Sequence, residues 1–389
     1  MTEQKNRVVV IGGGYAGVIA ANHLRLRPDV DITLVNPRRE FVERIRLHQM
    51  VAGTDDAVVE YAEILGPGIE LVVDEAIRID TGARQVDLAS SAPLPYDYLI
   101  YAVGSGSSRP TVPGADEFAY PIADLDEARR LTAALGELDH SAPVCVVGAG
   151  LTGIEVAAEL AEQGRAVTLV SGPVLGPYLS SPGRRSVAKR LRRLGVEIVD
   201  GPDSRVTAVA ADAVTLEDGR RLPSFVTIWT AGFGVPDLAS RSGLHTDAIG
   251  RLLTDETLTS IDDGRIVAAG DAAAPSGEPL RMSCQAAIPL GAQAADTVLS
   301  RIAGEQPAVI NQAFTGQCVS LGRGAGIIQL SHKDDTAMRL CIGGASAAKV
   351  KEAVCKGTIA ALRREARKPG SVFWFKGGRR VVGEAVPTP

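Results

Sequence analysis

The chain has 389 residues, of which 45% are hydrophobic and 22% charged, and its formal net charge at pH 7 is −5. This length allows two or three domains with a large buried core, and no apolar run approaches the ~20 residues that a membrane-spanning helix needs. The five cysteines form neither C-x-x-C nor C-x-x-x-x-C, which excludes a zinc ribbon and a locally encoded redox disulfide.

The N-terminal segment predicts a strand, a glycine-rich turn and a helix. Residues 8–11 are all Val or Ile, residues 12–17 read G-x-G-x-x-G, and a helix-forming stretch runs from residue 15 to about residue 26. A second strand over residues 32–35 ends at Asn36 and completes a mononucleotide-binding βαβ unit. In such a turn the second glycine lets the backbone approach a pyrophosphate, and the start of the helix favours its negative charge.

The same design returns 136 residues later. Residues 144–147 predict a strand, residues 148–153 repeat G-x-G-x-x-G, a helix runs on to Leu160, and a strand over residues 167–170 ends at Ser171. Each copy is followed by a strand that runs into small residues, over residues 96–105 and 225–234, and a Pro/Gly-rich boundary segment lies between the copies at residues 109–115. A duplicated architecture is the simplest account. Two such turns suggest that electrons pass between two dinucleotides.

The remainder of the chain changes in character. Residues 264–271 predict a strand and turn, residues 285–302 a helix, residues 317–321 and 326–330 two further strands, and residues 347–368 a basic helix that precedes the aromatic run at 373–375. Between Lys349 and Arg380 ten Lys or Arg stand against two Glu, a local charge of +8 that leaves −13 for the rest of the chain. This asymmetry favours an anionic partner or surface for the tail.

The order of motifs resembles the two-dinucleotide-binding-domain flavoproteins of the pyridine nucleotide-disulfide oxidoreductase superfamily. That order is GxGxxG, strand-Ala-x-Gly, GxGxxG, strand-Ala-Gly and Ile-x-Ala-x-Gly-Asp, over roughly residues 7–315. The resemblance implies an α/β fold with two Rossmann-like domains. Residues 1–115 and 235–315 would form an FAD domain, residues 116–234 an NAD(P)H domain inserted in it, and residues 316–389 a small C-terminal α+β region with the basic tail.

The resemblance also implies the FAD contacts. Asn36 stands where the family usually has Glu or Asp on the adenosine ribose, and its amide oxygen still accepts from a ribose hydroxyl. Asp271 would accept from the ribityl chain, although a carboxylate that caps the next helix is the alternative. The other implied contacts are Gly12, Gly14, Tyr15 and Ala16 at the pyrophosphate, Arg46 at a phosphate, and Ala102, Gly104, Gly270 and Ala287 around the flavin.

The second turn would hold the nicotinamide dinucleotide. Gly148, Gly150, Leu151 and Thr152 would surround its pyrophosphate, and Gly232 follows the second repeat strand. Ser171 occupies the strand end where NADH enzymes of the family tend to carry an acid, and no adjacent arginine marks an NADPH enzyme. The choice between NADH and NADPH therefore stays open, with NADH favoured.

The subfamily is predicted from two segments that lie around the flavin in proteins of this superfamily. Disulfide reductases carry C-x-x-x-x-C near residue 45, whereas this chain has Glu43 to His48 there. Cysteine-based NADH oxidases and peroxidases also lack support, because no cysteine occurs before Cys145. Residues 36–49 are more similar to type II NADH:quinone oxidoreductases and apoptosis-inducing factor. Residues 283–291 keep Gln285 and a small Ala pair of the quinone reductases' segment under the flavin, where the helix N-terminus would stabilise negative charge.

Three residues are expected to take part in the chemistry, and each has a structural alternative. Gln285 would lie beside the acceptor. His48 would serve as a proton donor near the isoalloxazine, or as a hydrogen-bonded structural histidine. Glu155 would polarise or relay protons near the nicotinamide and the flavin, or pack its helix. Cys284 would lie near the flavin as a packing thiol.

The predicted function is an FAD-dependent NAD(P)H dehydrogenase that passes two electrons from the flavin to a quinone-like acceptor. Two alternatives stay open: a reductase of a small ferredoxin-like protein, and a non-catalytic NADH-responsive flavoprotein resembling apoptosis-inducing factor. A cytoplasmic protein is expected. Its tail would either bind the inner face of the membrane peripherally or pack on the body of the protein. No metal and no nucleic-acid partner is expected, and a homodimer is left open.

Overall fold

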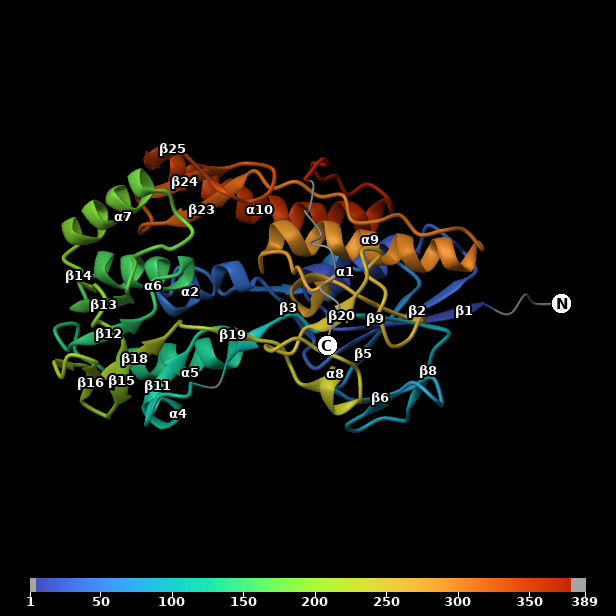
Figure 1. The fold of residues 1–389 in the computed structure, drawn as a ribbon, viewed down its shortest axis with the longest axis horizontal. Coiled ribbons are helices and arrows are strands. Elements are labelled where there is room, and N and C mark those ends of the chain that lie inside the picture. The colour runs from blue at the N-terminus through green and yellow to red at the C-terminus, as the bar shows by residue number, and fades with distance from the viewer. Residues whose placement is uncertain (1–4, 109, 379–389) are drawn as a thin grey trace, which may run out of the picture.

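A five-stranded parallel sheet organises the first half of the fold (Figure 1) in the computed structural model, which describes residues 5–108 and 110–378. Its order is β21 (Ile266–Ala268), β9 (Tyr98–Tyr101), β1 (Asn6–Ile11), β2 (Val30–Asn36) and β5 (Ile69–Val73). The continuous Val/Ile runs fit a parallel sheet that is covered on both faces. Arg109, Arg379 and Arg380 lie outside the described residues.

A second parallel sheet repeats this arrangement. Its order is β11 (Ala119–Pro121), β18 (Val226–Trp229), β12 (Val144–Val147), β13 (Val167–Gly172) and β14 (Glu197–Asp200). In both sheets the strand before the glycine turn is central, because β1 pairs with β2 and β9, and β12 pairs with β13 and β18. The predicted α/β class with two Rossmann-like units is confirmed.

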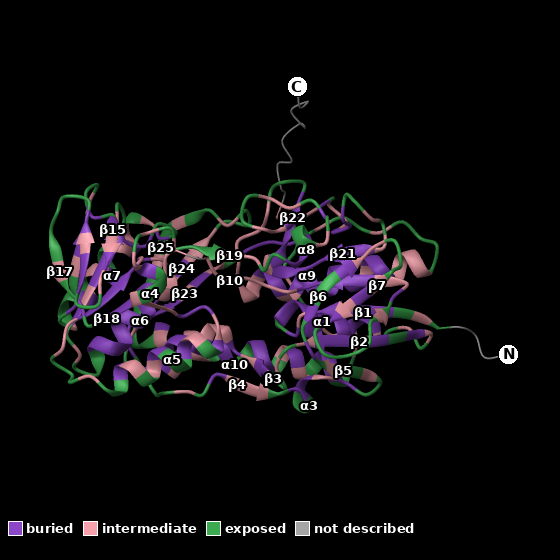
Figure 2. Cartoon of the chain, turned by 90° about the horizontal axis from the view of Figure 1, so that it is seen from below, coloured by how far each residue is buried: buried purple, intermediate pink, exposed green. Residues whose placement is uncertain are grey.

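Helices cover the sheets. In the first unit α1 (Tyr15–Leu24) packs against α9 (Cys284–Ile302), and in the second the covering helices are α5 (Leu125–Gly136), α6 (Leu151–Glu162) and α7 (Ser181–Arg193). Figure 2 shows two bodies side by side, each with buried strands inside and exposed loops outside. The two chain crossings between the bodies meet where β10 (Gly106–Ser107) pairs with β19 (Phe233–Gly234).

The C-terminal region forms a three-stranded antiparallel sheet and a long helix. The strands are β23 (Gly316–Ser320), β24 (Gly326–Ser331) and β25 (Ala337–Gly344), and the helix is α10 (Ala345–Arg367). The two predicted strands and the helix are confirmed, whereas β25 was not expected. The aromatic run is not a strand; Phe373 and Phe375 are exposed, and Trp374 donates a hydrogen bond to the carbonyl of Asn311.

Helix α10 packs on the body of the protein, against α1, β23 and β24. The sequence places Val350, Val354, Ile359 and Leu362 at near-helical spacing. Ile359 and Leu362 are buried together with Ala347 and Cys355, whereas Val350 and Val354 are 43% and 42% exposed. The second half of this apolar stripe therefore faces the body of the protein, and its first half faces outward. No helix of the described part of the chain is long and apolar enough to cross a membrane.

Small elements fill the connections. They are β3 (Glu40–Val42), η1 (Arg44–Arg46), α2 (Leu47–Val51), β4 (Val58–Glu60), α3 (Tyr61–Ile64), β6 (Ala76–Asp80), β7 (Gln85–Leu88), β8 (Leu94–Pro95), α4 (Ala115–Phe118), β15 (Val206–Val209), β16 (Ala213–Leu216), β17 (Arg221–Pro223), α8 (Leu238–Arg241), β20 (Leu252–Thr254), η2 (Gly270–Ala272) and β22 (Ala273–Pro275). Among them, η1 and α2 carry residues 44–51 from the first unit toward the second, where α2 packs on α5 and α6.

Candidate active site

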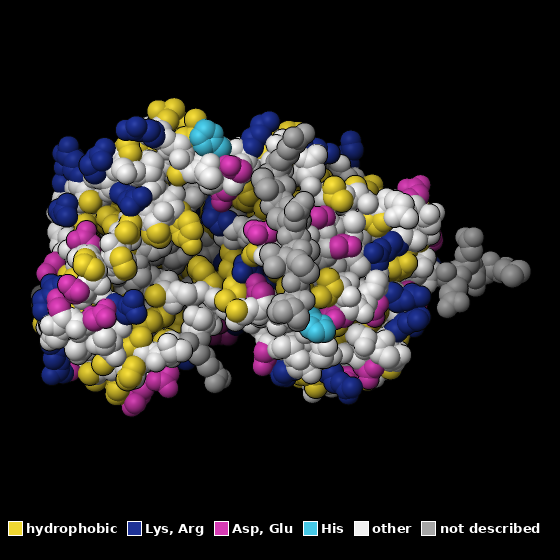
Figure 3. All heavy atoms as spheres, viewed as in Figure 1, with side chains coloured by type: hydrophobic (Ala, Val, Ile, Leu, Met, Phe, Trp, Pro, Cys, Tyr) yellow, Lys and Arg dark blue, Asp and Glu magenta, His cyan; other side chains and the backbone are white. Residues whose placement is uncertain are grey.

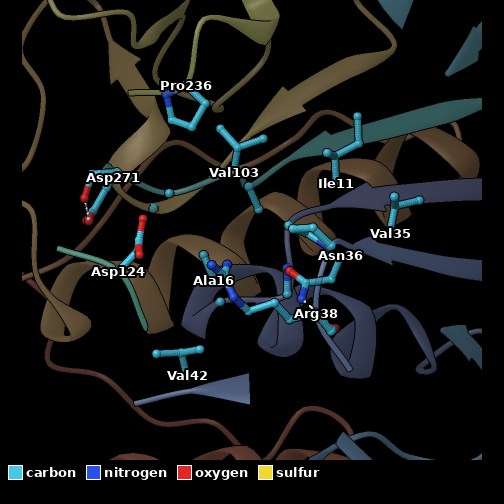
Figure 4. Close-up of a pocket in the computed structure, with 18 of the residues that line it drawn as sticks. Ile11, Ala16, Val35, Asn36, Arg38, Val42, Val103, Asp124, Pro236 and Asp271 are labelled. Carbon is cyan, nitrogen blue, oxygen red and sulfur yellow. Dashed lines mark hydrogen bonds between the residues drawn. The ribbon is translucent and has the colours of Figure 1, made fainter. Parts of the chain in front are cut away.

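A cavity of about 670 Å³ lies at the carboxyl ends of β1, β2, β9 and β21 (Figure 4). This edge of an open parallel sheet is where ligands bind in doubly wound folds. The predicted FAD contacts that line it are Gly12, Gly14, Tyr15, Ala16, Asn36, Ala102, Gly104, Gly270, Asp271 and Ala287. The structure thus brings together residues that are up to 275 positions apart in the sequence.

The first glycine turn leaves room for a phosphate. Gly12 has a φ of +101°, and a Cβ there would lie 2.3 Å from the carbonyl oxygen of Ala102, so a side chain is excluded. A Cβ on Gly14 would meet nothing within 4 Å, and Gly14 caps α1 without a side-chain hydrogen bond. The first amides of α1 are therefore available to an anion in the cavity.

Asn36 is tied into this turn. Its Oδ1 accepts a hydrogen bond of 2.9 Å from the amide of Gly13, and its Nδ2 donates to the carbonyl of Arg38. Figure 4 shows Asn36 and Arg38 together on one wall of the cavity. The Asn36 oxygen that was expected to meet a ribose hydroxyl is thus already used once, although it keeps a second lone pair.

Asp271 and Arg44 form another wall. Ser105 Oγ donates to Asp271 Oδ2 at 2.7 Å, and the Arg44 guanidinium lies 3.7 Å from the same oxygen while donating to Ser105 and to the carbonyl of Ala123. Helix α9 is capped by Ser283, so Asp271 is not its cap. The carboxylate remains available to the cavity.

Arg46 does not line this cavity, which corrects the expectation that it would bind a phosphate. Its guanidinium is buried and contacts Glu43, Gln49, Asp55 and Glu352. Although burial would lower the pKa of Arg46, these acids raise it. Of the two arginines of η1, Arg44 lines the cavity and Arg46 does not, because the 3₁₀ turn directs them to different sides.

The second glycine turn reproduces the first. Gly148 has a φ of +100°, and a Cβ there would lie 2.8 Å from Thr230 Oγ1. Gly150 caps α6 without a side-chain hydrogen bond and faces open space, as Gly14 does. The other predicted contacts are placed as follows: Leu151 and Thr152 are half-buried at the start of α6, and Gly232 has a φ of +87°.

Ser171 lies at the end of β13 but faces the backbone. Its hydroxyl donates to the carbonyls of Gly172 and Val199, and its side chain is buried. A register shift between Val170 and Gly172 accompanies this arrangement. The position at which the family carries an acid therefore presents no charge in this chain, and the donor choice stays open.

A buried charged cluster lies between α2, α6 and α10. Lys351 Nζ is 2.9 Å from Glu155 Oε1, and His48 Nδ1 is 3.6 Å from Glu155 Oε2. Burial would raise the pKa of Glu155 and lower that of Lys351, but their attraction reverses both directions, so the pair stays charged. Burial lowers the pKa of His48 to about 4, so its imidazole is neutral at pH 7, and its Nε2 has no hydrogen-bond partner.

The charge of this cluster reaches the start of α9. The Lys351 charge is close enough to lower the pKa of the Cys284 thiol, although burial raises that pKa overall, in keeping with a packing thiol. Gln285 Nε2 donates to Thr315 at 2.7 Å, and its Oε1 is buried without a partner. Gln285 itself does not line the large cavity, whereas Ala287, two residues further along α9, does.

Lys351 and Arg44 are the functional candidates that the sequence reasoning missed. For Lys351 a signal existed, because it stands four residues from both Ala347 and Cys355 on an otherwise small and apolar stripe of α10. A charged residue at such a position is buried only with a partner. Arg44 and Arg46 are only two residues apart, and the sequence offered no way to decide which of them faces the cavity.

Comparisons with known proteins agree with this architecture. The family model for pyridine nucleotide-disulphide oxidoreductases matches residues 6–291. An NADH dehydrogenase-like protein of Mycobacterium tuberculosis is 33% identical over 324 residues, which cover 76% of this chain and 80% of that protein. A type II NADH:quinone oxidoreductase of the same species is 28% identical over 354 residues, covering 78% and 74%. The sulfide:quinone oxidoreductase of Aquifex aeolicus shares the fold, with a TM-score of 0.79, 20% identity and coverage of 94% and 93%.

Proposed function

The chain belongs to the pyridine nucleotide-disulphide oxidoreductase family, and we propose that it is an FAD-dependent NADH dehydrogenase that reduces a quinone. FAD and NADH as cofactors and the dehydrogenase activity agree with its relatives, among them the type II NADH:quinone oxidoreductase of Mycobacterium tuberculosis. The quinone acceptor is the finer part of the proposal and rests on the site itself.

The residues of the large cavity fit FAD. The uncapped start of α1 and the open space at Gly14 suit the pyrophosphate, and Asp271 suits a ribityl hydroxyl. When bound, FAD takes a hydride from reduced nicotinamide and passes on two electrons. Arg44 orients the Asp271 carboxylate through Ser105, and the second glycine turn binds the nicotinamide dinucleotide.

One observation carries the choice of acceptor: the buried Lys351–Glu155 ion pair beside the start of α9. A quinone that receives two electrons also needs protons on its oxygens, whereas a one-electron protein acceptor needs none. The ammonium of Lys351 can donate a proton, and Glu155 stabilises its charge in the buried site. Neutral His48 supports Glu155 and is not itself a proton source at pH 7.

The acceptor is tested by anaerobic reduction with NADH followed by timed reoxidation. We expect rapid reoxidation by a water-soluble menaquinone analogue and slow reoxidation by an acidic ferredoxin. Rapid reoxidation by ferredoxin alone would make the chain a partner-protein reductase, which its basic surface would also fit. A long-lived charge-transfer complex with no fast acceptor would indicate a sensor resembling apoptosis-inducing factor. Running the reduction with NADH and with NADPH also settles the donor.

The two cap glycines offer a matched pair of variants. A Cβ at Gly14 or at Gly150 meets nothing within 4 Å, so Gly14→Ala and Gly150→Ala should both fold. We expect Gly14→Ala to weaken FAD retention about tenfold, which corresponds to about 1.4 kcal/mol, with NADH binding kept. Gly150→Ala should weaken NADH binding to a similar degree and keep the flavin. Bound flavin is measured by absorbance and NADH binding by titration; equal effects of the two variants on both ligands would contradict the assignment.

A basic and apolar face lies on α7 and β25, and we call it the α7–β25 face. Figure 3 shows Lys and Arg side chains gathered over α7, with hydrophobic side chains above them over β25. Leu340 and Ile342 on β25 are 57% and 46% exposed, and α7 packs against this strand. The exposed basic members are Arg185, Lys189, Arg192, Arg193 and Arg339. Cations around exposed apolar side chains suit an anionic bilayer surface, from which a lipid-soluble quinone would come.

We expect co-sedimentation with vesicles of phosphatidylglycerol at low ionic strength, weakened by added salt and absent with phosphatidylcholine. The double variant Leu340→Asp/Ile342→Asp should reduce vesicle binding about tenfold, because it removes apolar contact and adds negative charge. Phe225→Asp is the control, since Phe225 is 56% exposed and belongs to neither α7 nor β25. Equal binding by the double variant and the control would show that the α7–β25 face is not involved.

A further inference from the structure

A second carboxyl group is buried one turn beyond Glu155 on α6. Glu159 is 2% exposed, and its Oε1 accepts a hydrogen bond of 3.0 Å from Ser320 Oγ on β23. The amide of the same Ser320 donates to Glu155 Oε1 at 2.9 Å. One residue of β23 therefore connects the two carboxyl groups, and the quinone chemistry above uses only one of them.

The Ser320 hydroxyl has two acceptors within reach. Besides Glu159, its Oγ lies 3.2 Å from the carbonyl oxygen of Gly322. When Glu159 is ionised, the hydroxyl donates to the carboxylate. When Glu159 carries a proton, it can donate to Ser320 Oγ, and the serine hydrogen turns to Gly322. The surroundings thus accommodate both protonation states without leaving a buried donor unpaired.

A second cavity, of about 420 Å³, connects this place with solvent. Ser320 and Lys351 both line it, together with Gln49, Arg323, Lys349 and Glu352. A polar cavity of this size has room for water, and a water between Ser320 and Lys351 would complete the hydrogen-bonded chain Glu159–Ser320–water–Lys351.

The charged groups around Glu159 come from every element that packs there. Arg323 of the β23–β24 turn favours the ionised form, and Glu155 and Glu162 on α6 oppose it. Lys351 of α10 and His48 of α2 act on Glu155, and Arg190 of α7 is paired with Glu162. Burial is the largest effect and raises the pKa of Glu159 to about 7, where a carboxyl group can both take a proton from water and release it.

We propose that Glu159 and Ser320 form a proton entry that reloads Lys351 from the solvent of the second cavity. The inference rests on the proposed quinone reduction, in which NADH, one proton and a quinone give NAD⁺ and a quinol. The hydride brings two electrons and one proton, so the second proton comes from water in each turnover. Lys351 gives this proton to a quinol oxygen, and Glu159 returns one to it through Ser320 and the cavity water. Glu159 acts through Lys351 and contacts no substrate.

The test compares the wild type with Glu159→Gln, which keeps a hydrogen-bonding oxygen for Ser320 but carries no exchangeable acid. Quinone turnover of the wild type, at saturating NADH, should fall as the pH rises through about 7. In Glu159→Gln we expect a rate about tenfold lower at pH 6 and no inflection near pH 7. Reduction of hexacyanoferrate, which takes up electrons without protons, should be unchanged. In an infrared titration, the wild type should show a carboxylic acid band that disappears as the pH rises through about 7, and the variant should lack this band.

Glu162→Gln is the matched control, since Glu162 lies on the same helix but is partly exposed and paired with Arg190. It should keep the inflection and move it to lower pH, because Glu162 opposes the ionisation of Glu159. If Glu159→Gln does not fold, Ser320→Ala is the second variant. It removes the hydroxyl that links Glu159 to the cavity and keeps the backbone amide that donates to Glu155. It should slow quinone turnover about tenfold and retain the infrared band of Glu159. An unchanged pH profile and rate in these variants would overturn the proton entry alone. Absence of quinone reduction by the wild type, with hexacyanoferrate reduced normally, would overturn the acceptor assignment instead.

Discussion

Replacing Lys351 with Met is expected to lower quinone turnover at least about a hundredfold, the usual lower range for loss of a positioned proton donor. Lys351 is the only Lys or Arg within 4 Å of Glu155 in the described part of the chain, and the other basic residue there, His48, is neutral at pH 7. Met keeps the length and apolar body of the side chain and removes only the ammonium. Reduction of the bound flavin by NADH should stay within a few-fold of wild type, which stopped-flow absorbance separates from the quinone step.

The same substitution should destabilise the fold by about 3–5 kcal/mol, because it leaves the Glu155 carboxylate buried without its partner. Stability and activity are separated by the double variant Lys351→Met/Glu155→Gln, in which no buried charge is left unpaired. We expect the double variant to recover most of the unfolding free energy but not the quinone turnover. Lys356→Met is the control, because Lys356 lies on the same helix with its side chain 74% exposed and does not line the second cavity. Full quinone activity in the double variant would show that the ion pair is structural.

Replacing Glu365 with Ala is expected to give the largest loss of stability away from the active site, about 3–5 kcal/mol. Glu365 is fully buried on α10, and its carboxylate accepts hydrogen bonds from His23, from the amides of Gly370, Ser371 and Val372, and from the Ser371 hydroxyl. Without the carboxylate, these donors lose their acceptor, and the end of α10 loses its hydrogen bond to His23 of α1. Chemical denaturation measures the effect.

The control for this variant lies on the same helix. Arg363 pairs with Glu63 at the surface, where an exposed ion pair contributes about 1 kcal/mol at most. Arg363→Ala should therefore change the unfolding free energy far less than Glu365→Ala. Equal effects of the two variants would mean that α10 is held by its apolar face alone.

The His23 partner makes this attachment sensitive to pH. Burial would lower the pKa of His23, but hydrogen bonds to Asp296 and Glu365 raise it from 6.5 to about 9. The folded state holds this proton more tightly than the unfolded state. The contribution of protonated His23 to the folding stability is therefore fully present below pH 6.5 and is lost as the pH rises through about 9. His23→Gln should flatten the fall in melting temperature between these values. An unchanged slope would place the pH dependence elsewhere.

The elements near the two glycine turns could be predicted because their signals are local. A Val/Ile run, a glycine turn and a helix-forming stretch stand within about twenty residues of each other in both copies, and each signal reflects a backbone requirement of that segment alone. The structure has β1 at Asn6–Ile11 and β12 at Val144–Val147, which extends or matches the expected strands. β25 was missed because its exposed, mixed sequence pairs only along one side with β24.

The contacts of the site were harder, because they depend on segments that are far apart in the chain. Arg46 was expected at the cavity, yet Glu352, 306 residues away, binds it elsewhere. Choosing between Arg44 and Arg46 requires the direction of a short 3₁₀ turn relative to α10. Similarly, Ile359 and Leu362 of the apolar stripe of α10 are buried, but Val350 and Val354 are exposed. The sequence does not show that Lys351, between these two valines, meets Glu155 on the inward face.

The sequence by itself determined the duplicated α/β architecture, the two dinucleotide turns and the absence of a cysteine pair at the flavin, since each depends on residues close together in the chain. Only the tertiary structure decided which charges are buried together. Lys351, Glu155 and His48 come from three helices, and Glu159 meets Ser320 only because β23 packs on α6. A side chain's pKa depends on burial and on neighbours in space, and neither can be derived from local sequence.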